Sequence, residues 1–123
     1  MFLPTTDFPR AHEFYAGVLE LECSSRYPND IGGEFETGNL TIQIVDSAKI
    51  GRPFEPSKGA IALHVADVAG ARKRLEASGV EFQADTMDSG VCHMAFFEDP
   101  DGNALILHHR YAPRGERPEA LTS

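Results

Sequence analysis

Two histidines offer the most scope for chemistry in this sequence. His64 and His108 lie in apolar segments, residues 60–66 and 104–109, whose composition is typical of strands. Successive side chains of a strand point to opposite faces, and both imidazoles fall on the parity that the larger aliphatic residues leave free. We expect at least one imidazole to contact a ligand as donor, acceptor or general base, with a hydrogen-bonded wall residue as the alternative. The opposite parity is held by Ile61, Leu63, Val65, Leu105 and Leu107.

The other candidates for chemistry have simpler explanations. A strand predicted over residues 91–97 places Met94 and Phe96 on one face, either in the core or against a ligand. The acidic turn at residues 98–103 contains Asp-Pro-Asp-Gly-Asn, in which aspartates are expected to cap backbone amides rather than bind a cation. No nucleophile elbow, phosphate-binding glycine loop or paired-carboxylate arrangement is visible.

The composition excludes several classes of protein. The chain has 123 residues, 41% of them hydrophobic and 24% charged, which fits one globular domain. No apolar run approaches the roughly 18 residues that a membrane span needs, and the first residues lack a secretory signal, so we expect a cytoplasmic protein. A formal net charge of −8 argues against binding to nucleic-acid phosphates. Cys23 and Cys92 match no metal or redox motif and are expected to be buried free thiols.

Capping and periodicity predict the elements that position these residues. A helix is expected after Asp7, with Pro9 in its first turn and apolar residues at helical spacing behind it. Two strands follow over residues 34–37 and 40–45, joined by a Gly-Asn turn. In the second of these strands Gln43 faces away from the helix-covered side, because the isoleucines beside it take the opposite parity.

The second half of the chain begins a similar series of elements. The strand at residues 60–66 is followed by a helix that Asp67 is expected to cap. Three further strands are predicted over residues 80–83, 91–97 and 104–109.

An internal repeat decides the predicted architecture. Asp7 and Asp67 lie 60 residues apart, and a Gly-Asn pair opens the last strand of each half. A four-stranded sheet with one helix cannot bury both faces alone, so two such halves must combine. We predict an α+β fold in which two tandem βαβββ modules form a curved mixed sheet around a cleft. The predicted boundaries are residues 1–51 for module one, 52–58 for the linker, 59–111 for module two, and 112–123 for a flexible tail.

Three motifs resemble the vicinal oxygen chelate superfamily of glyoxalases, bleomycin-resistance proteins and dioxygenases. They are TDFPRAHEFY at residues 6–15, IALHVADV at 61–68 and FFEDPDGN at 96–103, which together with the repeat span nearly the whole chain. The sequence departs from the family's first-helix pattern at Glu20, where the family usually has glycine. The resemblance implies the same paired-module fold, but this superfamily carries lyases, isomerases, dioxygenases and drug-binding proteins on one scaffold.

The resemblance also gives positions at which a metal ligand is expected. Metal-dependent members use one residue from the first strand and one from the fourth strand of each module. In module one the first-strand position falls before Met1 and the fourth-strand position falls on Gln43. In module two the corresponding positions fall on Ala60 and on Ile106. A single neutral amide does not hold a divalent cation, so we expect the usual metal site and cofactor to be absent.

A relocated metal site is the alternative. Gln43, His64 and His108 could share a divalent metal on the cleft face. In the family's fold the two histidine strands are parallel neighbours, and we expect the imidazoles to be one to two residues out of register, about 3 to 7 Å.

Two functions remain after these exclusions. The first is a protein that binds a small metabolite or drug in an apolar cleft lined by Gln43, Ala60, His64, Met94, Phe96, Ile106 and His108. The second is a lyase or isomerase of glyoxalase type that uses a metal or one of the two histidines as a general base. The resemblance also implies a homodimer, in which a second subunit covers the apolar sheet faces.

Overall fold

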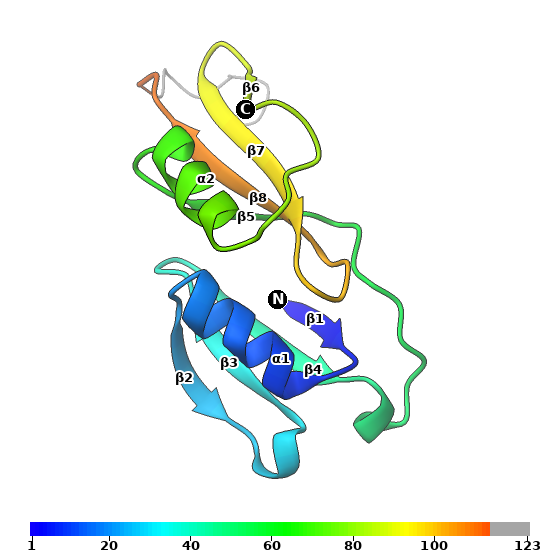
Figure 1. The fold of residues 1–123 in the computed structure, drawn as a ribbon. Coiled ribbons are helices and arrows are strands. Elements are labelled where there is room, and N and C mark those ends of the chain that lie inside the picture. The colour runs from blue at the N-terminus through cyan, green and yellow to red at the C-terminus, as the bar shows by residue number, and fades with distance from the viewer. Residues whose placement is uncertain (114–123) are drawn as a thin grey trace, which may run out of the picture.

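A computed structural model describes residues 1–113, in which one order of elements occurs twice (Figure 1). Each copy has a strand, a helix and three further strands, so the predicted pair of βαβββ modules is confirmed. Module one contains β1 (Phe2–Thr5), α1 (Phe8–His12) continued by the π-helix η1 (Glu13–Val18), β2 (Glu22–Arg26), the 3-10 turn η2 (Pro28–Asp30), β3 (Gly32–Glu36) and β4 (Thr41–Asp46). After the 3-10 turn η3 (Ala48–Ile50), module two contains β5 (Ile61–His64), α2 (Val68–Ala77), β6 (Met87–Asp88), β7 (Cys92–Glu98) and β8 (Ala104–Arg110).

The two sheets have matching topologies. The strand order is β1-β4-β3-β2 in module one and β5-β8-β7-β6 in module two. In each sheet the first strand pairs parallel with the last, and the other pairs are antiparallel. The helices lie on the same side of the molecule, each over its own sheet (Figure 1). We call the opposite side of each sheet its open face.

Alternation along the strands follows the sequence prediction. Most strand side chains under the helices are buried, whereas most of their neighbours on the open face are half-buried or exposed, with Pro4, Val45 and Cys92 as buried exceptions. This pattern places Gln43, His64 and His108 on the open faces, as their parity predicted. The buried strand residues under the helices include Leu3, Phe35, Ile42, Ile44, Ile61, Leu63, Ala95, Phe97, Leu105 and Leu107.

The two helices begin differently although an aspartate precedes each. The Asp7 carboxylate accepts a hydrogen bond from the backbone N–H of Arg10 at 3.1 Å, so its predicted capping role is confirmed. Asp67 has the same extended backbone, but its side chain forms no capping hydrogen bond. The prediction for Asp67 was therefore wrong in this respect.

The strand predictions need two corrections. Residues 80–83 form no strand, and only an isolated bridge pairs Phe82 with Phe97. The Phe82 ring instead packs 5.1 Å from the Phe97 ring, and the strand that pairs with β7 is Met87–Asp88. The polar edge strand β2 was missed, because its sequence lacks an apolar alternation.

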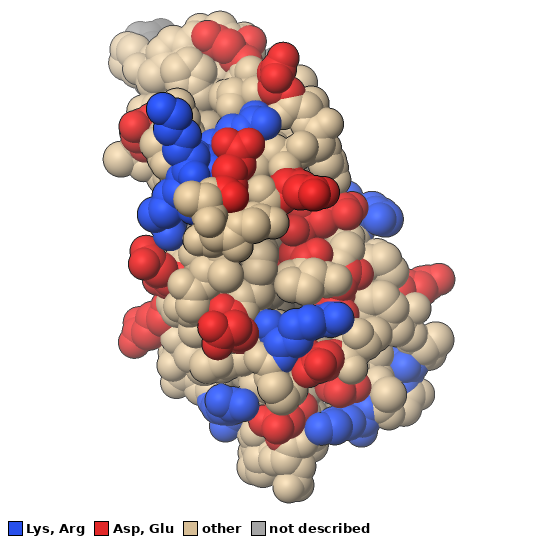
Figure 2. Space-filling model, in the orientation of Figure 1, with Lys and Arg blue, Asp and Glu red and all other residues tan. Residues whose placement is uncertain are grey.

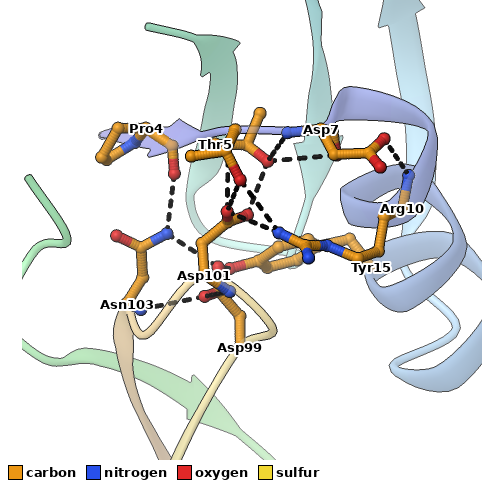
Figure 3. Close-up of polar contacts among 9 residues, drawn as sticks. Pro4, Thr5, Asp7, Arg10, Tyr15, Asp99, Asp101 and Asn103 are labelled. Atoms are coloured by element: carbon orange, nitrogen blue, oxygen red, sulfur yellow. Dashed lines mark hydrogen bonds and ion pairs between the residues drawn. The ribbon is translucent and has the colours of Figure 1, made fainter. Parts of the chain in front are cut away.

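The β7–β8 turn holds the modules together through Asp101 (Figure 3). The Asp101 carboxylate accepts hydrogen bonds from the hydroxyls of Thr5 and Thr6 and from the backbone N–H of Thr6. It also pairs with the Arg10 guanidinium at 2.8 Å, and its side chain is only 1% exposed. Asp101 was expected to cap its own turn, and its carboxylate instead contacts the other module.

Asp99 and Asn103 make the rest of this junction (Figure 3). Asp99 Oδ1 accepts from the backbone N–H groups of Asp101 and Asn103, which confirms the predicted capping role for Asp99 but not for Asp101. Asp99 Oδ2 accepts from the Tyr15 hydroxyl at 2.7 Å and from the Asn103 amide at 2.8 Å. The same amide donates to the Pro4 carbonyl of β1.

The linker, the C-terminal tail and the two cysteines were also predicted from the sequence. Residues 52–60 contain neither helix nor strand, in keeping with the predicted linker. The tail predicted over residues 112–123 lies outside the described residues from 114 onward. Both cysteines are free; Cys92 is buried, as expected, whereas Cys23 is only half-buried. None of the helices in residues 1–113 is long and apolar enough to cross a membrane.

Candidate functional site

The two predicted histidines meet on the open face of the module-two sheet. His64 of β5 and His108 of β8 are direct partners in the parallel register, and their Nδ1 atoms are 3.2 Å apart. The expected offset of one to two residues was therefore wrong. Register between strands more than 40 residues apart depends on how each strand packs under the helix, which the sequence pattern does not contain. A hydrogen bond at this distance requires one ring to carry a proton on Nδ1 and the other to accept there.

Apolar side chains lie beside this pair on the same face. Met94 of β7 pairs across the sheet with His108, and Phe96 pairs with Ile106 two residues further along. All three apolar side chains are half-buried although the structure places no helix over them. Ala60 lies just before β5 and is exposed. The strands thus bring together most of the residues proposed to line the ligand site.

Gln43 is positioned by the other sheet. It lies on β4, pairs with Phe2 of β1 and is exposed. Its amide donates to the Tyr27 hydroxyl at 2.8 Å, and that hydroxyl donates to Glu34 at 2.7 Å. The Gln43 hydrogen bond lowers the pKa of Tyr27, but partial burial and Glu34 together raise it above its ordinary value. Gln43 therefore belongs to a polar network of module one.

The family's metal positions do not fit a divalent ion in this chain. Ala60 and Ile106 carry no donor atom, and the Gln43 amide is engaged by Tyr27. Among residues 1–113, no three His, Cys, Asp or Glu side chains are grouped so that they could hold a metal ion. We derive no chemistry through a metal at these positions.

Arg110 is a candidate site residue that was not predicted from the sequence. It is the last residue of β8 and continues the open-face row of Ile106 and His108. Its Nε is buried and has no hydrogen-bond partner. The signal was available, because the alternation of β8 continues one residue past the predicted end of the strand at 109.

A cavity of about 490 Å³ lies elsewhere, at the junction of the modules on the helix side. Phe14 and Val18 of η1, residues 78–83, and residues 98–100 line it. Figure 2 shows acidic side chains gathered over this part of the molecule. The buried Asp99 in its wall is already bonded to Tyr15 and Asn103. None of the residues proposed from the sequence lines this cavity.

Three solved structures resemble this fold over most of both chains. Lactoylglutathione lyase from Agrobacterium tumefaciens has 20% sequence identity and a TM-score of 0.73, with 88% of this chain and 89% of that chain covered. A superfamily member from Sphaerobacter thermophilus DSM 20745 has 22% identity and a TM-score of 0.75, with 88% and 92% covered. TnmS3, an antibiotic binding protein from Streptomyces sp. CB03234, has 21% identity and a TM-score of 0.74, with 89% and 92% covered. At these identities the likeness concerns the fold alone.

A family model matches this sequence, whereas no curated protein does. Residues 1–107, which cover module one and module two as far as the middle of β8, match the model of the Glyoxalase/Bleomycin resistance protein/Dioxygenase superfamily. This match and the two βαβββ modules agree, so the chain belongs to the glyoxalase/bleomycin resistance protein/dioxygenase superfamily.

Proposed function

We propose that this protein binds a small metabolite or drug on the open face of the module-two sheet. The observation that carries the proposal is the combination of a paired imidazole, His64 with His108, and the apolar side chains of Met94, Phe96 and Ile106 on one face. Apolar walls with a few polar groups are typical of small-molecule sites, since the former supply affinity and the latter orientation. The antibiotic binding protein with a similar fold is in keeping with this function.

The binding proposal predicts the effects of two single substitutions. His64→Ala and His108→Ala should each weaken ligand binding while lowering the free energy of unfolding by less than about 1 kcal/mol, because neither side chain packs in the core. Ligands would be found by a thermal-shift screen of small aromatic metabolites, and affinities measured by NMR titration. Unfolding would be followed in urea.

His109→Ala is the matched control, because it removes an imidazole from the opposite parity of the same strand. It should leave ligand affinity unchanged. Loss of several kcal/mol of stability in the His64 and His108 variants with intact ligand binding would instead identify these histidines as structural residues, and the proposal would fail.

The His64–His108 contact also favours a second function, a lyase or isomerase of glyoxalase type. The ring that accepts at Nδ1 has a lone pair available for proton transfer once a substrate displaces its neighbour. Metal analysis and turnover assays on the purified protein separate the two functions. A stoichiometric divalent metal that survives dialysis, or turnover that His64→Ala abolishes, would favour the enzyme over the binding protein.

A further inference from the structure

We propose that the ligand of the open face is a carboxylate with an apolar body, and that Arg110 binds its carboxylate group. This inference rests on the proposed function, because it names the chemical class of the molecule bound at the same site. Among the side-chain nitrogen and oxygen atoms of residues 1–113, Nε of Arg110 is the one that is buried without a hydrogen-bond partner.

An unpaired buried N–H group destabilises the folded protein, so its presence needs a physical explanation. Leaving such a donor unsatisfied costs its full desolvation penalty, more for a charged group, and few native groups remain in this state. No carboxylate within the described residues forms an ion pair with the Arg110 guanidinium. A guanidinium presents its donors in a planar fork that matches a carboxylate, so an external carboxylate is the acceptor that fits.

The position of Arg110 places this acceptor at one end of the apolar face. Arg110 pairs across the sheet with Cys92, while Met94 and Phe96 follow at alternate positions along β7. At about 3.3 Å per residue, Phe96 lies roughly 13 Å along the strand from the level of Arg110. A molecule with its carboxylate at Arg110 would extend its apolar part past His108 toward Phe96.

The charges on this face favour an anion, although the chain as a whole carries a net charge of −8. Glu98 is the only acidic residue at the open-face positions of β5, β7 and β8. It lies six residues from Cys92 on β7, roughly 20 Å away, and Lys58 pairs with it at 3.7 Å. At the other end, the Arg110 cation stands in one row with His108, and His64 lies beside that row.

Carboxylate is favoured over phosphate by the charge balance. Arg110 is the only Lys or Arg at the open-face positions of β5, β7 and β8. One guanidinium neutralises one negative charge, whereas a phosphate monoester carries close to two at neutral pH and would leave the second charge beside apolar side chains.

Matched acid and amide probes test this inference on the full-length protein. NMR titration would compare three pairs, among them 3-phenylpropionate with 3-phenylpropionamide. The acids should bind at least about tenfold more tightly than their amides, because hydrogen bonds to charged groups are the stronger ones. Arg110→Gln should remove this preference by weakening binding of the acids. Arg110→Lys should retain part of it, since a point charge remains without the planar fork.

Arg52→Gln is the control for general electrostatics, because it removes the same charge from an exposed position of the linker. It should leave the preference for the acid intact. Equal affinity for acid and amide in the unaltered protein would overturn the inference and leave the proposed function standing. Failure of both members of every pair to shift open-face resonances would count against the proposed function as well.

Discussion

Asp99 and Asp101 lie two residues apart in one turn but have different partners. Asp101 contacts three residues of module one, whereas Asp99 accepts from its own turn and from the Tyr15 hydroxyl. Asp99 is buried, and within residues 1–113 its carboxylate oxygens accept hydrogen bonds without forming an ion pair. This arrangement makes the protonation of Tyr15 depend on the fold.

Tyr15 should make the protein's stability depend on alkaline pH. Burial, followed by the charge of Asp99 and the hydrogen bond to it, raises the pKa of Tyr15 far above its ordinary value of 10.0. The raised pKa stabilises the folded state fully below pH 10, and this contribution is lost above pH 10 because only the unfolded chain then releases the proton. The expected loss is about 1.4 kcal/mol per pH unit.

Tyr15→Phe isolates this effect. At pH 8 the variant should be less stable by about 1–2 kcal/mol, because a buried hydrogen bond to a carboxylate is lost. Above pH 10 the difference from the unaltered protein should shrink, since phenylalanine has no proton to release. Urea unfolding between pH 8 and pH 11 measures both values. A difference that stays constant over this range would show that Tyr15 titrates normally.

Residue-scale predictions from the sequence succeeded where a local rule decides the outcome. Alternation placed His64, His108 and Gln43 on the open faces because larger aliphatic neighbours require the helix side. The direct His64–His108 contact was not predictable, because it needs the register of two strands distant in sequence. Arg110 was missed because the predicted strand ended one residue too early.

At the scale of elements, the backbone after the first helix is strained at a residue where the sequence departs from the family pattern. The helix continues as the π-helix η1, and Glu20, between it and β2, has φ of 59°. The family resemblance expects glycine at this position, and glycine adopts positive φ without steric penalty. Glu20 gains only an exposed ion pair with Arg74 at 3.2 Å.

Glu20→Gly should therefore stabilise the protein. We expect a gain of about 0.5–1 kcal/mol, the relief of the left-handed backbone less the added freedom of the unfolded chain. Glu20→Gln is the control, because it removes the charge and keeps the side chain, and it should change stability by less than about 0.5 kcal/mol. Thermal and urea unfolding measure both variants. A glycine variant less stable than the glutamine variant would contradict this account.

Other elements were predictable only in part. The βαβββ order could be predicted from repeated caps and turns, which are local features. By contrast, β2 is polar and β6 has two residues, and neither length nor pattern distinguishes such strands from loops. The candidate strand at 80–83 failed because Phe82 is held by ring packing rather than by a ladder.

At the scale of the whole molecule, the β7–β8 turn makes the buried polar contacts between the two modules, whereas Arg74 adds exposed contacts to Glu20 and Val18. The Asp101 carboxylate is almost fully buried and accepts from Thr5, Thr6 and Arg10, all of module one. Removing one partner from a buried charged pair costs more than the pair contributes, because the other charge is left uncompensated. Asp101 should therefore matter more for stability than any exposed acidic residue of the same turn.

Asp101→Asn tests whether this turn joins the modules. The amide nitrogen cannot accept, so the variant should lose about 2–4 kcal/mol of unfolding free energy in urea, and backbone NMR resonances of Thr5 and Thr6 should shift. Glu98→Gln is the matched control in the same turn; its ion pair with Lys58 is largely exposed, so a change below about 0.5 kcal/mol is expected. Equal effects of the two substitutions, with Thr5 and Thr6 unshifted, would mean that Asp101 does not join the modules.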